Sequence, residues 1–189
     1  MPESTAIIDA CSLINFYATA FLESILKHLS LNFYIVEQVK NESLYIRRPD
    51  ESERGFDYEA IVLDPYFKSN LLEVVSLETD NEKKLFINLA DQLDDGEAAT
   101  LAIAISREMQ VITDDKKAIR ILRQDFPAIH YLTTLDIMKD WSKRDFIEFQ
   151  EIKKALHNIL IYANYLPPHK HHLFNWWKSI LESVSLSEL

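Results

Sequence analysis

Thr5-Ala6-Ile7-Ile8-Asp9 is an apolar run that ends in an aspartate, and such a run predicts a short buried strand. Behind it, residues 13–29 carry apolar side chains at helical spacing, including Phe16, Phe21, Ile25 and Leu29. This spacing predicts a helix. A strand followed directly by a helix is the repeating unit of α/β proteins.

The same alternation continues along the chain. Residues 33–36 predict a second strand, and Val39 and Glu42 lie about one helical turn apart in the segment that follows. Further strands are predicted over residues 71–77, 111–113 and 129–132, with helices over residues 81–93, after Gly96, and over residues 116–123. Repeated β–α units predict an α/β fold with a mostly parallel sheet.

Two parts of the chain depart from this alternation. Residues 47–70 are rich in charge and contain two prolines, which predicts an insertion with some helix around residues 58–63. From residue 135 onward no strand is expected, only amphipathic helix through Tyr162, a break at Pro167-Pro168, and a terminal helix with Trp176 and Trp177. We therefore expect a main domain over residues 1–135 and a C-terminal helical extension over residues 136–189.

Composition narrows the class of protein. The chain has 20 Lys+Arg against 30 Asp+Glu, a net charge of −10, which argues against a broad basic surface that coats nucleic acid. Any contact with nucleic acid must then be local. The apolar runs are shorter than the roughly 20 residues of a membrane-spanning helix, and no secretion signal is evident, so a cytoplasmic protein with no membrane contact is expected.

Several kinds of active site are excluded by what the sequence lacks. Gly55 and Gly96 are the only glycines, so a dinucleotide fingerprint, a P-loop and a nucleophile elbow are absent. Cys11 is the only cysteine, which excludes an internal disulfide and a cysteine zinc site within one chain. The histidines near the C-terminus, His169 and its neighbours, lack the spacing of a helical metal-binding pair and predict an exposed polar turn.

Carboxylates follow two of the predicted strands. Asp9 ends the first strand and Asp114 and Asp115 end a later one, and ligands of open α/β sheets bind at these carboxyl ends. Glu97 lies in the first turn of the helix opened by Leu93-Asp94-Asp95-Gly96, where the helix dipole favours an ionised carboxylate. Converging carboxylates repel one another and normally persist around a cation, and oxygen-only ligation selects Mg²⁺ or Mn²⁺.

Four short blocks match, in order, the acidic motifs of PIN domains. The blocks are Ile7-Ile8-Asp9-Ala10-Cys11-Ser12, Val39-Lys40-Asn41-Glu42, Leu93-Asp94-Asp95-Gly96-Glu97-Ala98 and Val111-Ile112-Thr113-Asp114-Asp115. The sequence resembles this family over roughly residues 5–135, and the third block is the most specific of the four.

The resemblance implies a set of roles for these residues. The implied catalytic residues and metal ligands are Asp9, Glu42, Glu97 and Asp115, with Asp114 as an alternative to Asp115. Ser12 and Thr113 are expected as polar neighbours of the ligands. The family fold is an α/β/α sandwich around a parallel sheet.

The resemblance also implies a function. Two-metal chemistry would make the chain a metal-dependent endoribonuclease that hydrolyses RNA. Many members of the family are ribonuclease toxins of the VapC type that are held by an antitoxin, and homodimers are common. The insertion and the C-terminal extension are longer here than in those compact toxins. The alternative is a catalytically inactive PIN-like module that binds RNA or a protein through its helical extension.

Simpler structural roles compete with several of these assignments. Asp9 could only cap the helix that follows, and one of Asp114 and Asp115 is expected to cap the helix that begins at Lys116. Glu42 is the weakest ligand candidate, since surface helices carry glutamates freely. The residues expected to bind nucleic acid, with a solvated helical face as the alternative, are Lys116, Lys117 and Arg120.

Overall fold

A five-stranded parallel sheet forms the centre of the computed structural model, which describes residues 4–42, 44–49 and 55–183. The strand order is β5-β2-β1-β6-β7. The strands are β1 (Ser4–Ile8), β2 (Leu31–Val36), β5 (Glu73–Val75), β6 (Gln110–Ile112) and β7 (Tyr131–Leu132). Every neighbouring pair is parallel, so the predicted α/β class with a mostly parallel sheet is confirmed.

β1 is the middle strand and is buried on both faces. Ala6, Ile7 and Ile8 have no exposed surface, and Ile7 pairs with Tyr34 of β2 and with Val111 of β6. A parallel strand covered on both sides reads as a continuous apolar run rather than as an alternation. The run 6–8 therefore specifies the centre of the sheet.

The helices α5 (Asp80–Ala90) and α6 (Asp95–Arg107) form an antiparallel pair beside the sheet. α6 packs over β1, β2 and β6, and α5 packs on α6. The sheet side of α6 contains Ala98, Ala102 and Ile103, all without exposed surface. Residues 91–94 separate the two helices, and Gly96 lies inside the first turn of α6 rather than before this helix, where the sequence placed it. The short helix α3 (Glu37–Asn41) packs between β2 and α6.

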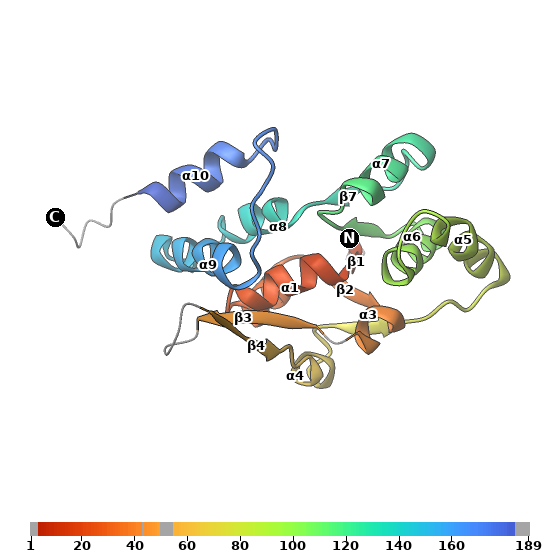
Figure 1. Cartoon of the computed structure of the whole chain (residues 1–189), viewed down its shortest axis with the longest axis horizontal. Helices are drawn as coiled ribbons and strands as arrows, with labels where there is room; N and C mark the ends of the chain where they lie inside the picture. Colours follow the sequence, from red (N-terminus) through yellow and green to blue (C-terminus); the bar gives the residue numbers. More distant parts are fainter. Residues whose placement is uncertain (1–3, 43, 50–54, 184–189) are drawn as a thin grey trace.

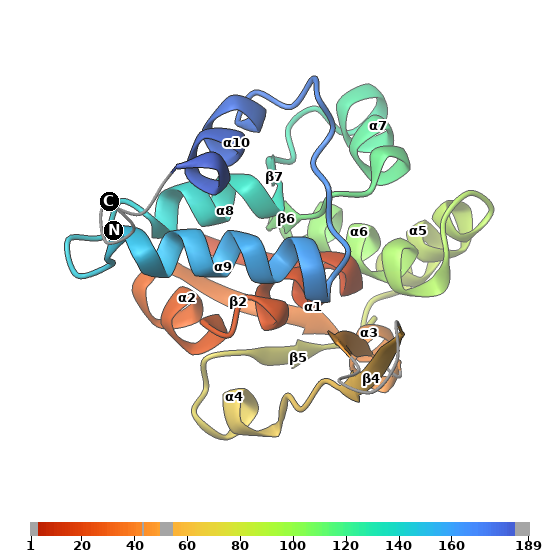
Figure 2. The same ribbon diagram turned by 60° about the vertical axis from the view of Figure 1, so that its left-hand side comes forward.

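A second group of helices packs together through α1. This group consists of α1 (Ala10–Ala18), α2 (Leu22–His28), α8 (Thr134–Trp141) and α9 (Phe149–Tyr162). Figure 2 shows α9 lying across α1, while α7 (Lys116–Asp125) stands apart, close to α6 and β7. Helices thus flank the sheet, as expected for an α/β sandwich.

The single helix predicted over residues 13–29 is wrong, because the structure breaks it into α1 and α2. Ala20 adopts a left-handed backbone conformation with φ of 66°. The buried Thr19 hydroxyl donates to the carbonyl of Phe16 and accepts from the backbone N–H of Phe21. A threonine side chain that bonds its neighbouring backbone competes with helix continuation. The helical spacing of apolar residues continues from α1 into α2, so the sequence pattern gave no sign of the break at Ala20.

The helix predicted around residues 58–63 is also wrong. Residues 58–60 belong instead to β4 (Phe56–Ala60), which pairs antiparallel with β3 (Tyr45–Pro49), and the next helix along the described chain is α4 (Asp64–Lys68). Aromatic and acidic residues alternate in β4, which is the period of a strand. Buried Ile46 anchors β3, whereas every residue of β4 is exposed.

The C-terminal region is helical, as expected, but it is divided into more helices. A loop over residues 142–148 separates α8 from α9, and α10 (Phe174–Glu182) follows the prolines. Ile152 and Leu156 of α9 and Trp177 of α10 belong to the same apolar cluster as β1. The domain division at residue 135 stays a prediction. None of the helices in the described residues has the length and apolar character needed to cross a membrane.

Candidate active site

Two parallel neighbours, β1 and β6, bring their following residues together. Ile8 pairs with Ile112, and the backbone N–H of Asp9 donates to the carbonyl of Ile112 over 3.1 Å. The chain then continues as Asp9 on one side and as Thr113, Asp114 and Asp115 on the other. The ladder between β1 and β6 therefore places these acids at one edge of the sheet.

Asp9 is both a helix cap and a buried carboxylate, with 3% of its surface exposed. Its Oδ1 accepts from the backbone N–H of Ser12 at 2.6 Å and caps α1, and its Oδ2 accepts from the Thr113 hydroxyl at 2.5 Å. Burial raises the pKa of Asp9 to about 6, while these hydrogen bonds act in the opposite direction. Thr113 and Ser12 are thus direct neighbours of Asp9, where the sequence placed them.

Of the two acids that follow β6, Asp115 is the one that caps the next helix. Oδ1 of Asp115 accepts from the backbone N–H groups of Lys117 and Ala118, both at 2.7 Å, and so caps α7. Asp114 instead forms its hydrogen bonds with residues outside α7. Burial raises the pKa of Asp114 and its hydrogen bonds lower it.

Three residues that sequence reasoning missed surround Asp114. It accepts from the Tyr165 hydroxyl at 3.1 Å, from the Asn15 amide at 3.3 Å and from the backbone N–H of Thr134 at 3.3 Å. Asn15 also donates to the Thr134 hydroxyl at 3.0 Å. A buried asparagine in an otherwise apolar helix could have signalled this contact, but nothing in the sequence near Tyr165 pointed to the acids that follow β6.

Glu97 lies in the first turn of α6, next to the same acids. Asp94 caps this helix by accepting from the backbone N–H of Glu97 at 2.8 Å. Burial raises the pKa of Glu97 to about 7, and the negative charges of Asp115, Asp94 and Asp9 raise it further. Asp9, Glu97, Asp114 and Asp115 are called the acid cluster below.

Glu42 is close to this cluster but beside a different acid. It follows α3, and a Cβ atom at Gly96 would lie 2.5 Å from its Oε1. Partial loss of hydration raises the pKa of Glu42, and the charge of Asp94 raises it further. Glu42 therefore lies near Asp94 at the start of α6, whereas Asp9 and Asp115 lie near Glu97.

Cys11 lies in the electrostatic field of the whole acid cluster. Its side chain is exposed by area, yet partial enclosure of the thiol raises its pKa to about 12, and the nearby carboxylates of Asp9 and Glu97 add to this rise. A thiol with so high a pKa stays protonated at neutral pH and is a poor nucleophile. The chemistry of this site is accordingly carboxylate chemistry, not thiol chemistry.

The acid cluster offers the oxygen ligands that Mg²⁺ and Mn²⁺ prefer. The buried Ser12 hydroxyl has no hydrogen bond of good geometry within the described residues, although its proximity to Asp9 lowers the pKa of that carboxyl. A polar buried group and mutually repelling carboxylates are what a bound cation would satisfy. In the part of the chain that the structure describes, no three His, Cys, Asp or Glu side chains stand arranged around a single metal position.

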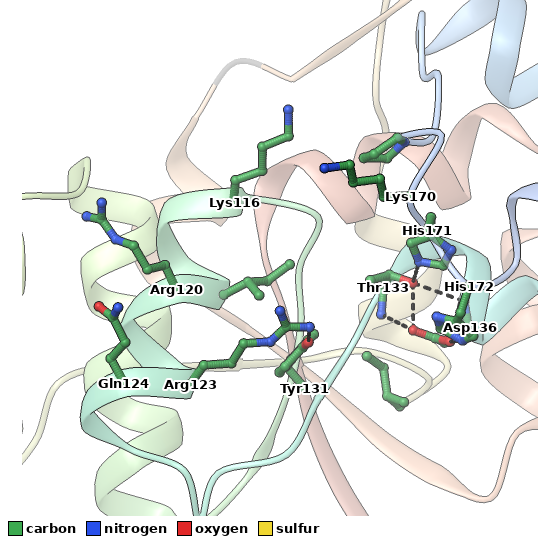
Figure 3. A pocket seen from close by; sticks show the side chains of 13 residues that line it. Lys116, Arg120, Arg123, Gln124, Tyr131, Thr133, Asp136, Lys170, His171 and His172 are labelled. Atoms are coloured by element: carbon green, nitrogen blue, oxygen red, sulfur yellow. Dashed lines mark hydrogen bonds and ion pairs between the residues drawn. The ribbon is translucent and has the colours of Figure 1, made fainter.

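A cavity of about 870 Å³ lies beside the acid cluster, between α7 and the segment that joins α9 to α10 (Figure 3). Its basic side chains are Lys116, Arg120, Arg123, Lys170, His171 and His172, and we call it the basic pocket. Two of the three residues predicted to bind nucleic acid thus line one cavity. The third, Lys117, instead donates to the carbonyl of Gln92.

The C-terminal histidines only partly match the exposed turn that was predicted. His169 and His172 are exposed, but His171 is half-buried because its Nε2 bonds the Thr133 hydroxyl at 3.0 Å. The expectation for His171 is corrected on this point. The spacing of the histidines gave no signal for a contact with a residue so far back in the chain.

Comparison with known proteins agrees with this geometry. No curated protein matches the chain. A family model described as a PIN domain matches residues 5–172, which includes every member of the acid cluster, the strands of the central sheet and the segment that lines the basic pocket. The chain therefore belongs to the PIN-domain family, whose members are generally nucleases.

Proposed function

We propose that this protein is a metal-dependent endoribonuclease that hydrolyses phosphodiester bonds at the acid cluster. The observation that carries the proposal is the proximity of Asp9, which follows β1, Asp115, which caps α7, and Glu97, which lies in the first turn of α6. The charges of Asp115 and Asp9 raise the pKa of Glu97, and such repulsion is a cost in a site without a function for these acids.

The proposed ligands are Asp9, Glu97 and Asp115, with Mg²⁺ or Mn²⁺ as the ion. Oδ2 of Asp115 accepts no hydrogen bond within the described residues, while both oxygens of Asp114 accept from surrounding donors. Asp115 is thus the better direct ligand of the two. Asp114 links Asn15, Thr134 and Tyr165 through its hydrogen bonds. When bound, divalent ions would supply an activated water and charge stabilisation for the leaving oxygen.

The chain's own residues have three tasks in this proposal. Thr113 and the Ser12 backbone fix the orientation of Asp9, because each occupies one of its oxygens. Glu97 stands where its carboxylate faces the charge of Asp115. Lys116, the first residue of α7, follows Asp115 directly and is placed to hold a phosphate of the strand being cut.

The test is cleavage of short single-stranded and structured RNAs by purified protein with Mn²⁺, Mg²⁺ or EDTA. We expect cleavage only with metal, and a loss of at least about 100-fold in Asp9→Asn and in Glu97→Gln, because even residues behind metal ligands typically contribute 10–100-fold. Asp125→Asn, an exposed acid at the far end of α7, is the matched control and should cleave normally.

Retained cleavage in Asp9→Asn would contradict the proposal. Absence of cleavage by the parent protein on every RNA, with metal bound, would favour the second candidate, an inactive module that binds RNA or protein. That candidate has its own support, since residues 168–172 of the helical extension line the basic pocket. A toxin role, an antitoxin partner, a homodimer and a cytoplasmic location stay predictions.

A further inference from the structure

The basic pocket is assembled from three segments that are distant in sequence. α7 supplies Lys116 and Arg120, and the junction of β7 and α8 supplies Leu132 and Thr133. The segment after α9 supplies Pro168, Lys170, His171 and His172. In Figure 3, Lys116 and Lys170 stand on opposite sides of the cavity. A cavity of about 870 Å³ is within the range of small-molecule sites, roughly 300–1,000 Å³.

The cations around the pocket are available to bind a ligand. Within the described residues, no carboxylate forms an ion pair with Lys116, Arg120 or Lys170. The whole chain carries a net charge of −10, and the cations gathered in this cavity stand out against that negative background. An anionic ligand is the natural counterpart.

Asp136, which lines the pocket, finds its hydrogen-bond partners within the pocket wall. Oδ2 of Asp136 accepts from the Thr133 hydroxyl at 2.6 Å and from its backbone N–H at 2.9 Å, and Oδ1 pairs with Nε2 of His172 at 2.9 Å. These partners satisfy the acid from within the wall of the pocket. Within the described residues, Asp136 therefore forms no ion pair with the lysines and arginines of the pocket.

His171 completes the wall as a neutral ring. Its Nδ1 accepts from the backbone N–H of Leu173 at 3.1 Å, so the ring proton is on Nε2, which donates to the Thr133 hydroxyl. Burial lowers the pKa of His171, which agrees with the neutral form. His171 is thus a fixed structural donor, and the cations that remain for a ligand are those of α7 and Lys170.

Part of the pocket surface is apolar. Ile119, Leu132 and Pro168 line it, and the Arg123 guanidinium lies 5.3 Å from the centre of the Tyr131 ring while also donating to the Tyr131 hydroxyl. A simple inorganic anion needs no apolar wall. A ligand that joins a phosphate to a flat, partly apolar group would use both surfaces.

The pocket also adjoins the acid cluster. Lys116 follows Asp115, and Thr133 precedes Thr134, whose backbone N–H holds Asp114. We propose that the basic pocket binds one phosphorylated nucleoside, with its phosphate between Lys116 and Lys170 and its base or sugar on the apolar wall. The choice of a ribonucleotide, rather than another organic phosphate, rests on the function proposed above.

The phosphorylated nucleoside could be one nucleotide of an RNA strand or a free mononucleotide. The experiment measures binding in EDTA, where no metal-dependent cleavage occurs, so its result does not depend on whether the protein cuts RNA. A fluorescently labelled RNA of about six nucleotides is titrated with the parent protein, Lys170→Glu, Lys116→Gln and the double variant. Uridine and adenosine monophosphates are titrated in parallel by calorimetry.

Lys84→Glu, on the exposed face of α5, is the matched control for a change of charge. We expect each pocket variant to weaken binding by about tenfold, the equivalent of one charge-assisted hydrogen bond, with no change in the control. Mononucleotide binding as tight as that of the RNA identifies a free nucleotide as the ligand. Tighter binding of the RNA, with both weakened by the variants, identifies a strand.

Equal weakening by Lys84→Glu and by the pocket variants would overturn the proposal, because binding would then follow net charge alone. Binding of a poly-glutamate peptide without binding of either nucleotide form would also overturn it and would assign the pocket to an acidic protein segment. Circular dichroism of each variant checks that the fold is retained. Loss of cleavage with retained nucleotide binding would refute the proposed function but leave this inference standing.

Discussion

Gly96 matters for the space that it leaves and not for backbone freedom. An added Cβ would lie 2.5 Å from Glu42 Oε1 and 3.4 Å from Val39 Cγ2. The closer atom is the end of a flexible side chain, so it can move aside while the helix stays intact. The glycine of the third sequence block therefore positions the glutamate of the second.

Gly96→Ala should separate stability from activity. Alanine is the better helix former, so we expect the free energy of unfolding to stay the same or rise by up to about 1 kcal/mol, measured by urea denaturation. If Glu42 takes part in catalysis, its displacement should lower metal-dependent cleavage. In a Glu42→Ala background the same substitution should cost nothing further, and an additive loss would show that Gly96 acts by another route.

The pKa of Asp9 makes a prediction about pH. Its folded value of about 6 lies above 3.8, so the folded state binds this proton more tightly than the unfolded state. The stabilisation is therefore present below pH ~4 and is lost as pH rises to ~6, by about 3 kcal/mol in total.

Asp9→Asn removes this titration and leaves that of Glu97 in place. In EDTA, the stability of the variant relative to the parent should accordingly increase between pH ~4 and pH ~7, measured by urea unfolding. Asp125→Asn serves as the control, with a curve parallel to that of the parent. A parallel curve for Asp9→Asn would mean that Asp9 is not perturbed as the structure indicates.

At the scale of elements, three helices that begin at the site each have an aspartate as their cap. Asp9 caps α1, Asp94 caps α6 and Asp115 caps α7. At Asp115, cap and ligand are not alternatives, because its Oδ2 accepts no hydrogen bond within the described residues. The same residues set where each helix begins and where the charge converges.

Substitutions at Asp115 can separate these two roles. Asp115→Ala should lower the free energy of unfolding by about 1 kcal/mol, since two backbone N–H groups lose their acceptor, while Asp115→Ser should restore most of it. Thermal unfolding measures both. We expect both variants to lose cleavage, because serine restores the cap but not the carboxylate. Normal cleavage by Asp115→Ser would leave Asp115 as a cap alone.

The sequence predicted those strands and helices that short apolar runs and capping residues determine. The apolar runs of β1, β2 and β6 and the acidic start of α6 were evident, and the acids at the strand ends followed from them. The break at Ala20 and the pairing of β3 with β4 depend on tertiary contacts. Buried Thr19 accepts from the Asn158 amide of α9 through its carbonyl at 3.0 Å, and such long-range contacts have no trace in a short window.

The candidate site divides in the same way. Asp9, Glu97 and Asp115 were found because they lie at predictable ends of strands and helices. Tyr165 and His171 were missed as parts of the site, since each reaches it from a loop after α9. A loop has no periodic pattern of apolar residues. Its position next to the site therefore depends on the complete fold and cannot be read from a short stretch of sequence.

For the molecule as a whole, the balance of charge predicts how binding responds to salt. The net charge of −10 leaves only a local cationic region for RNA. If about three cations of the basic pocket contact phosphates, a plot of the logarithm of the binding constant against that of salt concentration should have a slope near −2 for single strands.

Anisotropy titrations in EDTA between about 50 and 200 mM salt measure this slope. Lys170→Glu should make it shallower by about 1 or less, whereas Lys84→Glu should leave it unchanged. A slope near −6 for the parent would require a broad basic surface, contrary to the charge of this chain.

The path of the chain after α9 has a consequence for biosynthesis. Tyr165 donates to Asp114, and Pro168, Lys170, His171 and His172 form one wall of the basic pocket, whereas Asp9 lies more than 150 residues earlier in the sequence. A ribosome releases the chain from its N-terminus at about 5–20 residues per second, so these residues emerge well after Asp9 and the strands of the sheet. A nascent chain can therefore fold its central sheet while it still lacks this wall, and the site is complete only once the chain up to His172 has left the ribosome.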